Sequence, residues 1–436
     1  MRIRVAYDIS FLATFLKHPE GQSGVHRTVE ELFFELCGRD DIELTAVAAC
    51  GEDPLLDVTN ASLYVSNHKD RLACRFEPSL VGRLGLSAFY LRAFGGDAAK
   101  DGGEASRAVR QSGRFERAQH LLTRLVRKLD RPRLALDGRP YDVFHSPFLK
   151  LPPSALVGGI PKILTVYDLI FLKNPEFMTP GLVTFLRGIF DSVNVERDWV
   201  TCISEFTKQE FCEFTGMAPE RAFVTPLAAA DHFRPVTDPE RIAAARRRYG
   251  IPEGDYFLAL GTLQPRKNFA HLIRCFFRLL SEHPEVGVSL VIVGVSGWLY
   301  EEIFEAGGSS DEFRGKVVFT GYVPNADLSA VYGGATAFLF PSLYEGFGLP
   351  ALEAMQCGVP VIASNTTAFP EVVGDAGLLV DPTDADALCQ AMLDLWSDEG
   401  LRRRLGQKGL ARSKKFSWAD CAEKTVRAYK TAVGAV

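Results

Sequence analysis

The sequence predicts an α/β fold of two doubly wound domains whose parallel sheets face each other across a cleft. Short apolar runs alternate with helical stretches along the chain, and strand–helix–strand order implies parallel sheets. The runs form two series that meet near Ala228–Asp238, and 436 residues are too many for one ordinary core. Ligands of such sheets bind beyond the carboxyl ends of the strands, so two facing crevices make one deep cleft.

The expected strands are continuous apolar runs, a pattern that suits strands buried on both faces. In chain order they are Ile3–Tyr7, Tyr141–His145, Lys162–Tyr167, Trp199–Ile203, Tyr256–Leu260, Ser289–Val293, Val317–Thr320, Ala335–Phe340 and Val359–Ala363. We therefore expect a Rossmann-like N-terminal domain over residues 1–234 and a Rossmann-like C-terminal domain over residues 235–412.

The chain ends in an amphipathic helix within residues 413–436. Trp418, Cys421, Val426 and Tyr429 predict its apolar stripe. We expect this helix to return to the N-terminal domain, although the pattern itself does not identify the surface that it covers.

Residues 94–130 break the alternation and predict a mobile insertion. Residues 95–104 are rich in glycine and charge and poor in large apolar side chains. Residues 120–129 then combine leucines with Arg124, Arg127 and Lys128. A basic amphipathic helix of this kind lies either on the protein's own surface or on an anionic membrane, such as the inner face of the cell membrane.

Composition and charge limit which cellular compartment and which kinds of partner we expect. The net charge of -5 does not indicate nucleic acid as the main partner, and no apolar run approaches the roughly 18 residues of a membrane-spanning helix. The nine cysteines are irregularly spaced, as in reduced thiols. Asp8 interrupts the N-terminal apolar run too early for a signal peptide, so we expect a cytoplasmic protein.

The stretch Phe340–Met355 carries the strongest chemical signal. A strand ends near Phe340, and a loop with Gly346 and Gly348 leads to a helix whose first turn accommodates Pro350. A helix N-terminus presents unpaired N–H groups, and glycines let a ligand approach the backbone closely. The stretch therefore predicts a diphosphate site.

Two acids flank this predicted site. Glu345 precedes the helix and Glu353 lies inside it, and carboxylates of this kind recognise the hydroxyls of a sugar or ribose. The alternative is an ordinary loop-to-helix turn in which Glu353 only complements the helix dipole.

A second loop opens the C-terminal domain directly after its first strand. Gly261 and Thr262 predict a tight strand exit, and Arg266 and Lys267 follow where the crevice lies. Two cations neutralise a diphosphate and stabilise the charge on a departing nucleoside diphosphate. The alternative is a solvated basic pair at a helix start, a position that the helix dipole disfavours.

Together the two loops resemble the retaining glycosyltransferases of family 4, which have the GT-B fold. The resemblance rests on Arg266-Lys267-Asn268 and on Glu345-Gly-Phe-Gly-Leu-Pro-Ala-Leu-Glu353. It implies a nucleotide-diphosphate sugar donor, retention of configuration at the anomeric carbon, no cofactor and no required metal. The donor-binding residues that it implies are Gly24, Gly261, Thr262, Arg266, Lys267, Glu345, Gly346, Phe347, Gly348, Leu349 and Glu353.

The resemblance also implies a role for each part of the site. Arg266 and Lys267 would bind the donor diphosphate, Glu353 the ribose and Glu345 the donor sugar, and we count Arg266, Lys267 and Glu345 as catalytic candidates. The backbone of residues 346–349 would contact sugar hydroxyls and phosphates, and the N-terminal domain would bind the acceptor.

A strand end of the N-terminal domain supplies a further match. Val166-Tyr-Asp-Leu169 resembles the family's His-Asp-Leu or Tyr-Asp-Leu element, with Tyr167 where many relatives have histidine. This departure puts a histidine-centred role there in doubt. We expect Asp168 to orient the acceptor and to accept its proton; the alternative is a cap on the following loop.

Three weaker candidates lie in the same domain. His145 ends a predicted strand and is expected to face the cleft as a catalytic candidate; the alternative is a hydrogen-bonded structural histidine. Gly24-Val-His-Arg27 resembles the family's Gly-rich N-terminal loop, which approaches the donor phosphates. Ser204 follows another strand and is expected to cap a helix.

Other catalytic signatures are missing from the sequence. No Gly-x-Ser-x-Gly elbow, no Gly-x4-Gly-Lys-Ser/Thr loop and no His/Cys cluster with metal spacing occurs. We expect transfer of a sugar, with mannose from GDP-mannose as the family-weighted choice, to a saccharide or lipid-linked saccharide in surface-polysaccharide synthesis. The rivals are another GT-B enzyme such as a nucleotide-sugar epimerase or a phosphorylase, a non-catalytic nucleotide-sugar-binding protein, and a scaffold contacted through residues 94–130.

Overall fold

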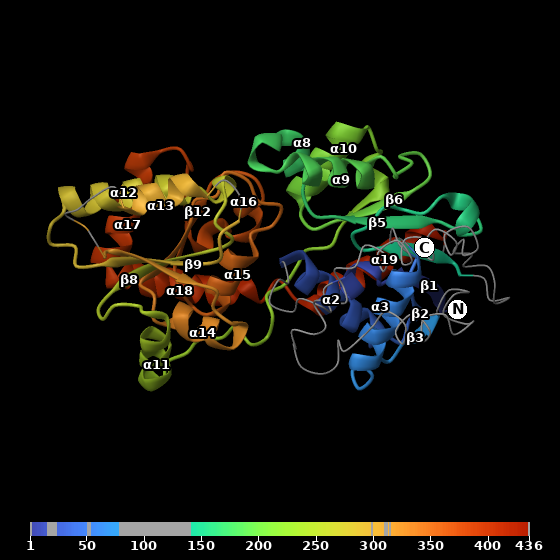
Figure 1. The fold of residues 1–436 in the computed structure, drawn as a ribbon, viewed down its shortest axis with the longest axis horizontal. Coiled ribbons are helices and arrows are strands. Elements are labelled where there is room, and N and C mark those ends of the chain that lie inside the picture. Colours follow the sequence, from blue (N-terminus) through green and yellow to red (C-terminus); the bar gives the residue numbers. More distant parts are fainter. Residues whose placement is uncertain are drawn as a thin grey trace, which may run out of the picture.

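The computed structural model describes residues 2–14, 24–49, 54–77, 141–297, 300–308, 313 and 315–434. Two α/β lobes lie side by side in it, each built on its own parallel sheet (Figure 1). The predicted insertion at 94–130 lies outside the described residues.

The N-terminal lobe has a sheet to which seven strands of the described chain belong, with every neighbouring pair parallel. From edge to edge they are β3 (Arg75–Glu77), β2 (Ile42–Val47), β1 (Ile3–Asp8), β4 (Val143–Ser146), β5 (Lys162–Val166), β6 (Trp199–Cys202) and β7 (Ala222–Val224). The strand order reverses between β1 and β4, which is where doubly wound sheets open a ligand crevice.

The C-terminal lobe repeats this plan with six strands of the described chain, again parallel throughout. From edge to edge they are β10 (Val317–Gly321), β9 (Ser289–Val293), β8 (Tyr256–Leu260), β11 (Ala337–Phe340), β12 (Val361–Ser364) and β13 (Leu378–Val380). The order reverses between β8 and β11, so the loops that leave these two strands meet at one edge of the sheet.

Helices cover both faces of each sheet. In the N-terminal lobe they are α1 (Ser10–Thr14), α2 (Gly24–Cys37), α3 (Pro54–Asn67), α8 (Ile170–Lys173), α9 (Pro180–Phe190) and α10 (Glu205–Thr215). In the C-terminal lobe they are α11 (Pro239–Tyr249), α12 (Phe269–Glu282), α13 (Glu301–Gly308), α14 (Asn325–Gly333), α15 (Leu349–Gln356), α16 (Phe369–Val372), α17 (Ala385–Ser397) and α18 (Glu399–Ser413). Helices α2 and α3 pack on one face of the first sheet and α8–α10 on the other (Figure 1).

Burial explains why continuous apolar runs became strands. Every residue of β5, β9, β11 and β12 is buried, whereas every residue of the edge strand β10 is half-buried. The predicted two Rossmann-like α/β domains are therefore confirmed. The prediction did not include β2 or the three-residue edge strands β3, β7 and β13, which are too short for a periodic signal.

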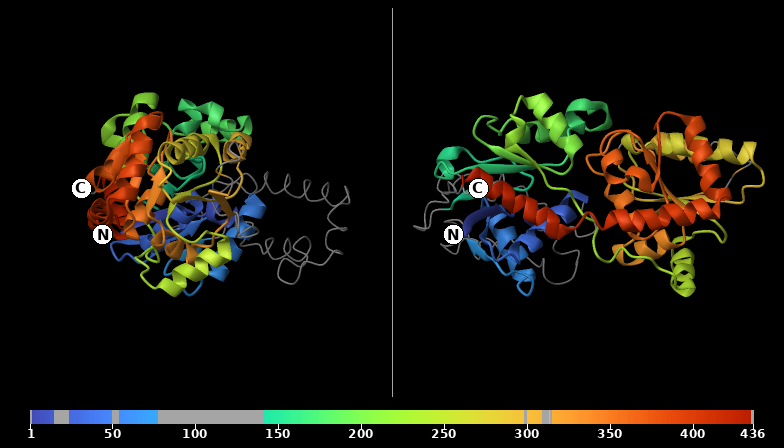
Figure 2. Two further views of the ribbon diagram at one scale, coloured as in Figure 1. Left: turned by 90° about the vertical axis from the view of Figure 1, so that its left-hand side faces the viewer. Right: turned by 180° about the vertical axis from the view of Figure 1, so that it is seen from behind.

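The last helix, α19 (Trp418–Ala432), leaves α18 and lies against the N-terminal lobe (Figure 2). Cys421, Val426 and Tyr429 share a buried core with β1 and α2. Trp418 is half-buried and contacts the cores of both lobes. Across the described part of the chain, no helix is both long and apolar enough to cross a bilayer.

Candidate functional site

Two loops of the C-terminal lobe meet at the carboxyl ends of β8 and β11. The first contains a 3₁₀ turn at Pro265–Lys267, and the second runs from Pro341 to the start of α15. The backbone N–H of Leu343 donates to the carbonyl of Arg266 at 2.8 Å. Asn268, with a φ of 61° that asparagine tolerates better than most residues, donates to the carbonyls of Pro341 and Pro382. These hydrogen bonds fix the two loops relative to each other.

An ion cluster forms where the loops meet. Arg266 Nη1 lies 2.5 Å and Lys267 Nζ 2.6 Å from the same carboxylate oxygen, Oε1 of Glu345. Lys267 and Glu345 are buried, and Lys267 Nζ also lies 4.5 Å from the centre of the Phe340 ring. Gly261 makes room for this lysine, because a Cβ at that position would stand 3.1 Å from Lys267 Cε.

Burial and charge set the ionisation of the cluster. Burial opposes the charged form of Glu345, but the charges of Arg266 and Lys267 outweigh it and lower the pKa of Glu345 to about 2. Burial, together with the neighbouring Arg266 charge, lowers the pKa of Lys267 to about 8. Arg266 and Lys267 are therefore both charged at neutral pH, and two adjacent cations suit a diphosphate.

The start of α15 lies beside this cluster. Gly348 precedes the helix with a φ of 94°, which favours glycine, and Pro350 occupies the first turn as predicted. Phe347 is buried in the core, so the residues 346–349 offer a ligand mainly their backbone. Glu353 is only 1% exposed and accepts a hydrogen bond from the Tyr332 hydroxyl at 3.2 Å.

The N-terminal lobe closes directly over these elements. Arg27 Nη2, in the first turn of α2, lies 2.5 Å from Oε1 of Glu353. The backbone of Gly346 packs against the carbonyl of Tyr167 and the Cβ of Asp168, where a side chain at position 346 would collide. The Ser204 hydroxyl donates to the Gly346 carbonyl at 2.7 Å. Both lobes therefore build the same site.

Further contacts between the lobes surround this centre. The Tyr344 hydroxyl accepts the Leu169 N–H at 3.1 Å and donates to the carboxylate of Glu210. The Glu371 carboxylate accepts the N–H groups of Glu205 and Phe206, each at 2.9 Å, at the start of α10. A carboxylate there complements the positive end of the helix. Ser204 caps the same helix as predicted, since its hydroxyl accepts the Thr207 N–H.

Asp168 lies half-buried at the carboxyl end of β5, beside Gly346. Its Oδ1 accepts the Ile170 N–H at 3.3 Å, so it does cap the following turn. Burial raises the pKa of Asp168, and the charge of Arg266 opposes that rise. The side chain thus combines the capping contact with a position facing the cation cluster.

The prediction that His145 faces the cleft is wrong. Its imidazole is fully buried, with Nδ1 2.7 Å from the Tyr429 hydroxyl of α19 and Nε2 2.8 Å from the Thr165 hydroxyl. Both ring nitrogens are therefore occupied inside the lobe, and burial lowers the pKa of His145 to about 3. This is the structural histidine of the alternative interpretation.

Two predicted donor residues do not join the cluster. Thr262 is exposed, and its methyl group lies beside Gly297 rather than beside Lys267. Gly24 is exposed at the start of α2, and residues 15–23 before it lie outside the described residues. The sequence analysis assigned no contact to Arg27, Tyr332 or Tyr344. For Arg27 a signal was available, because the segment Gly24–Arg27 resembles the family's N-terminal loop. Among the described residues, no three His, Cys, Asp or Glu side chains gather as a metal site requires.

Comparison with known proteins agrees with this architecture. Residues 242–412 match the family model Glycosyl transferases group 1. O-antigen chain mannosyltransferase B of Escherichia coli is 34% identical over 319 residues, which cover 72% of this chain and 82% of that protein. A GDP-mannose-dependent alpha-(1-6)-phosphatidylinositol monomannoside mannosyltransferase of Mycolicibacterium smegmatis is 34% identical over 268 residues, which cover 59% of this chain and 68% of that protein.

The solved structure of sucrose-phosphate synthase from Thermosynechococcus elongatus superposes with a TM-score of 0.61 at 20% identity, with 100% of each chain covered. That likeness concerns the fold. The family model and the mannosyltransferase relative place the chain in the glycosyl transferases of group 1, and the protein is therefore a glycosyltransferase with the GT-B fold.

Proposed function

We propose that the protein transfers a mannosyl group from GDP-mannose to a saccharide or lipid-linked saccharide during surface-polysaccharide synthesis, with retention of configuration and without a metal. The names of the two mannosyltransferase relatives support the choice of sugar. The assignment rests chiefly on one observation: Arg266, Lys267 and the loop before α15 meet at the junction of the two lobes, where Gly346 packs against Asp168.

In this proposal the donor lies across both loops of the C-terminal lobe. Arg266 and Lys267 bind the diphosphate, together with the backbone of residues 346–349 that leads into α15. Glu353 accepts the ribose hydroxyls, and Glu345 contacts the sugar. The charges of Arg266 and Lys267 stabilise the nucleoside diphosphate as the bond between the anomeric carbon and the phosphate oxygen breaks.

The acceptor hydroxyl approaches the anomeric carbon from the face that the phosphate leaves. Its oxygen forms the new glycosidic bond, and its proton passes to the departing phosphate or to Asp168. The raised pKa of Asp168, caused by burial, makes this carboxylate a better proton acceptor than an exposed aspartate. The proposal requires no covalent nucleophile.

We further propose that the reaction takes place in the cytoplasm, at the inner face of the cell membrane when the acceptor is lipid-linked. Within such a setting the nucleotide sugar is the soluble substrate, and the acceptor brings the enzyme to the membrane.

Thermal unfolding with a panel of GDP, UDP, ADP, TDP and CDP tests the donor site, because a ligand that binds only the native state raises its stability. We expect GDP with EDTA present to raise the melting temperature, and Glu353→Ala to abolish the shift. The matched control is Glu253→Ala, because Glu253 is an exposed glutamate to which the proposal assigns no contact with the donor. Absence of any shift in folded wild-type protein would contradict the proposal. A shift with UDP alone would show that the donor carries UDP instead of GDP.

A further inference from the structure

The short helix α16 carries a carboxylate across the junction of the two lobes. Glu371 is half-buried, and its Oε2 accepts the N–H of Glu205 while its Oε1 accepts the N–H of Phe206, each at 2.9 Å. In Figure 1, α16 lies at the edge of the C-terminal lobe that faces the N-terminal lobe. The first turn of α10 is therefore bound by a side chain of the other lobe.

Helix α16 is fixed within its own lobe at both ends. At its start, the Phe369 ring lies so close to Gly348 that a Cβ at position 348 would stand 2.9 Å from a ring carbon. At its end, the guanidinium of Arg412 on α18 donates to the carbonyls of Glu371 and Val372, both at 2.7 Å. The Glu371 carboxylate therefore has a fixed position relative to residues 341–348, which we call the donor loop.

Helix α10 is bound to the same donor loop from the N-terminal lobe. The hydroxyls of Ser204 and Thr207 both donate to the carbonyl of Gly346, at 2.7 Å and 3.3 Å. Further along the helix, Glu210 accepts the hydroxyl of Tyr344. The Glu371 contact therefore stands beside two others that seat α10 on the donor loop, and it is the one that a carboxylate of α16 makes.

A carboxylate suits the first turn of α10 because a helix N-terminus presents N–H groups without partners in the helix and the positive end of the helix dipole. Two such N–H groups on one carboxylate form charge-assisted hydrogen bonds. Burial raises the pKa of Glu371, and the bonds from Phe206 and Glu205 oppose that rise. Separation of the lobes would return the carboxylate and the N–H groups to water, so these bonds favour the closed arrangement.

The closed arrangement matters because the two lobes contribute different parts of the site. Asp168 belongs to the N-terminal lobe, whereas Arg266 and Lys267 belong to the C-terminal lobe. Domains of one chain move relative to each other unless a large apolar interface joins them. We propose that Glu371 is a positioning residue, which holds α10 against the donor loop so that the lobes meet in the arrangement required for transfer. The inference rests on the proposed function, because it concerns the assembly of that same site.

Small-angle X-ray scattering of the whole protein, with and without GDP, measures how the lobes are arranged. We expect Glu371→Ala to increase the radius of gyration by about 1 Å, and Glu371→Gln, which keeps an acceptor oxygen without the charge, to increase it less. The matched control is Asp398→Ala, because Asp398 accepts the Leu401 N–H at 2.8 Å at the start of α18, inside one lobe. This control should lower the melting temperature and leave the radius of gyration unchanged.

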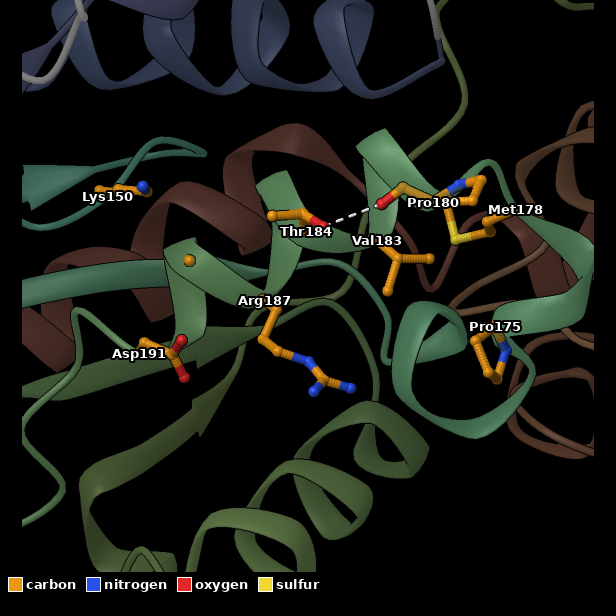
Figure 3. Close-up of a pocket in the computed structure, with 9 residues that line it drawn as sticks. Lys150, Pro175, Met178, Pro180, Val183, Thr184, Arg187 and Asp191 are labelled. Carbon is orange, nitrogen blue, oxygen red and sulfur yellow. Dashed lines mark hydrogen bonds between the residues drawn. The ribbon is translucent and has the colours of Figure 1, made fainter.

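Two substitutions of the exposed Glu205 test the contact from the α10 side. Glu205→Pro removes one N–H that Glu371 accepts, at the first helical position, where proline is favoured. Pro180 begins α9 of the same lobe in this way, beside a groove of about 610 Å³ (Figure 3). Glu205→Ala removes the carboxylate but keeps the N–H. We expect Glu205→Pro alone to act like Glu371→Ala, and to add little when the two are combined.

Transfer kinetics separate positioning from stability. GDP-mannose serves as the donor and methyl α-mannoside as the acceptor. We expect Glu371→Ala to lower the turnover number by about tenfold and to leave the KM for GDP-mannose within about twofold, because the donor contacts remain while two charge-assisted hydrogen bonds of the closed arrangement are lost. Asp398→Ala should keep the wild-type turnover number despite its lower melting temperature.

A radius of gyration unchanged in Glu371→Ala and Glu205→Pro would overturn the inference. A wild-type turnover number in Glu371→Ala, or an equal loss in Asp398→Ala, would overturn it as well. The GDP-dependent thermal shift and the wild-type turnover report the proposed function separately. Their absence in wild-type protein would reject the proposed function, whereas the scattering of the variants would still decide whether Glu371 holds the lobes together.

Discussion

Arg27 and Glu353 form an ion pair of 2.5 Å that joins the two lobes at the centre of the site. Arg27 belongs to the first turn of α2, and Glu353 lies buried within α15. Oε2 of the same carboxylate accepts the Tyr332 hydroxyl. Burial raises the pKa of Glu353, while the charge of Arg27, the hydrogen bonds of Tyr332 and Arg27, and the charge of Lys267 oppose the rise. The carboxylate assigned to the nucleotide therefore depends on a cation from the other lobe.

Arg27→Gln should make nucleotide binding sensitive to mild acid. Without the guanidinium, the pKa of Glu353 rises further, so the carboxylate protonates at a higher pH and accepts the ribose hydroxyls less well. We expect the midpoint of the pH-dependent loss of GDP affinity to move upward by about one unit. Arg27→Lys should restore the wild-type profile. A profile unchanged in Arg27→Gln would contradict this account of the ion pair.

The ion-cluster residues that the sequence identified each lie in a short motif directly after the end of a strand. Arg266 and Lys267 follow β8, and Glu345 follows β11. The two strands are neighbours in the sheet, so loops almost 80 residues apart in the chain meet by topology alone. Motif and sheet order together were enough to predict this half of the site.

Two of the contacts that sequence reasoning missed depend on how the lobes pack. Arg27 and Glu353 are 326 positions apart, and Tyr344 and Glu210 are 134 apart. No periodicity or spacing relates such pairs. The wrong orientation of His145 has the same origin, because its partner Tyr429 comes 284 positions later, from a helix whose docking surface the apolar stripe did not identify.

Nucleotide affinity should fall in mild alkali because of Lys267. Its pKa of about 8 in the free protein means that the ammonium loses its proton as the pH rises through that value. A bound diphosphate stabilises the charged form, so we expect a constant GDP dissociation constant near pH 7 and about a tenfold increase per pH unit above about 8. Lys267→Arg keeps its charge over this range and should flatten the profile. The same alkaline slope in Lys267→Arg would show that another group titrates.

Gly346→Ala should block transfer while leaving nucleotide recognition intact. The added Cβ would collide with the carbonyl of Tyr167, so the lobes could no longer meet at this point. A displacement of about 1 Å between the donor loop and Asp168 costs about a hundredfold in rate. We expect that loss in the turnover number, with the GDP-dependent thermal shift retained. Gly287, where a Cβ meets nothing within 4 Å, supplies the matched control Gly287→Ala, which should behave as wild type.

His145→Gln should alter stability and leave catalysis unchanged. The pKa of His145 falls from 6.5 to about 3 in the folded protein because the imidazole is buried, whereas the unfolded chain keeps the ordinary value. Between these values the unfolded state binds one more proton than the folded state. The stabilisation from the buried neutral imidazole is therefore complete above pH 6.5, and the free energy of unfolding decreases as the pH falls toward 3. The decrease amounts to at most roughly 5 kcal/mol, at 1.36 kcal/mol for each unit of pKa. Denaturant titrations at several pH values should show that the free energy of unfolding depends less steeply on pH in His145→Gln than in wild type. Sugar transfer by this variant at neutral pH should stay within about twofold of wild type. A large loss of turnover in a stable variant would return His145 to the catalytic site.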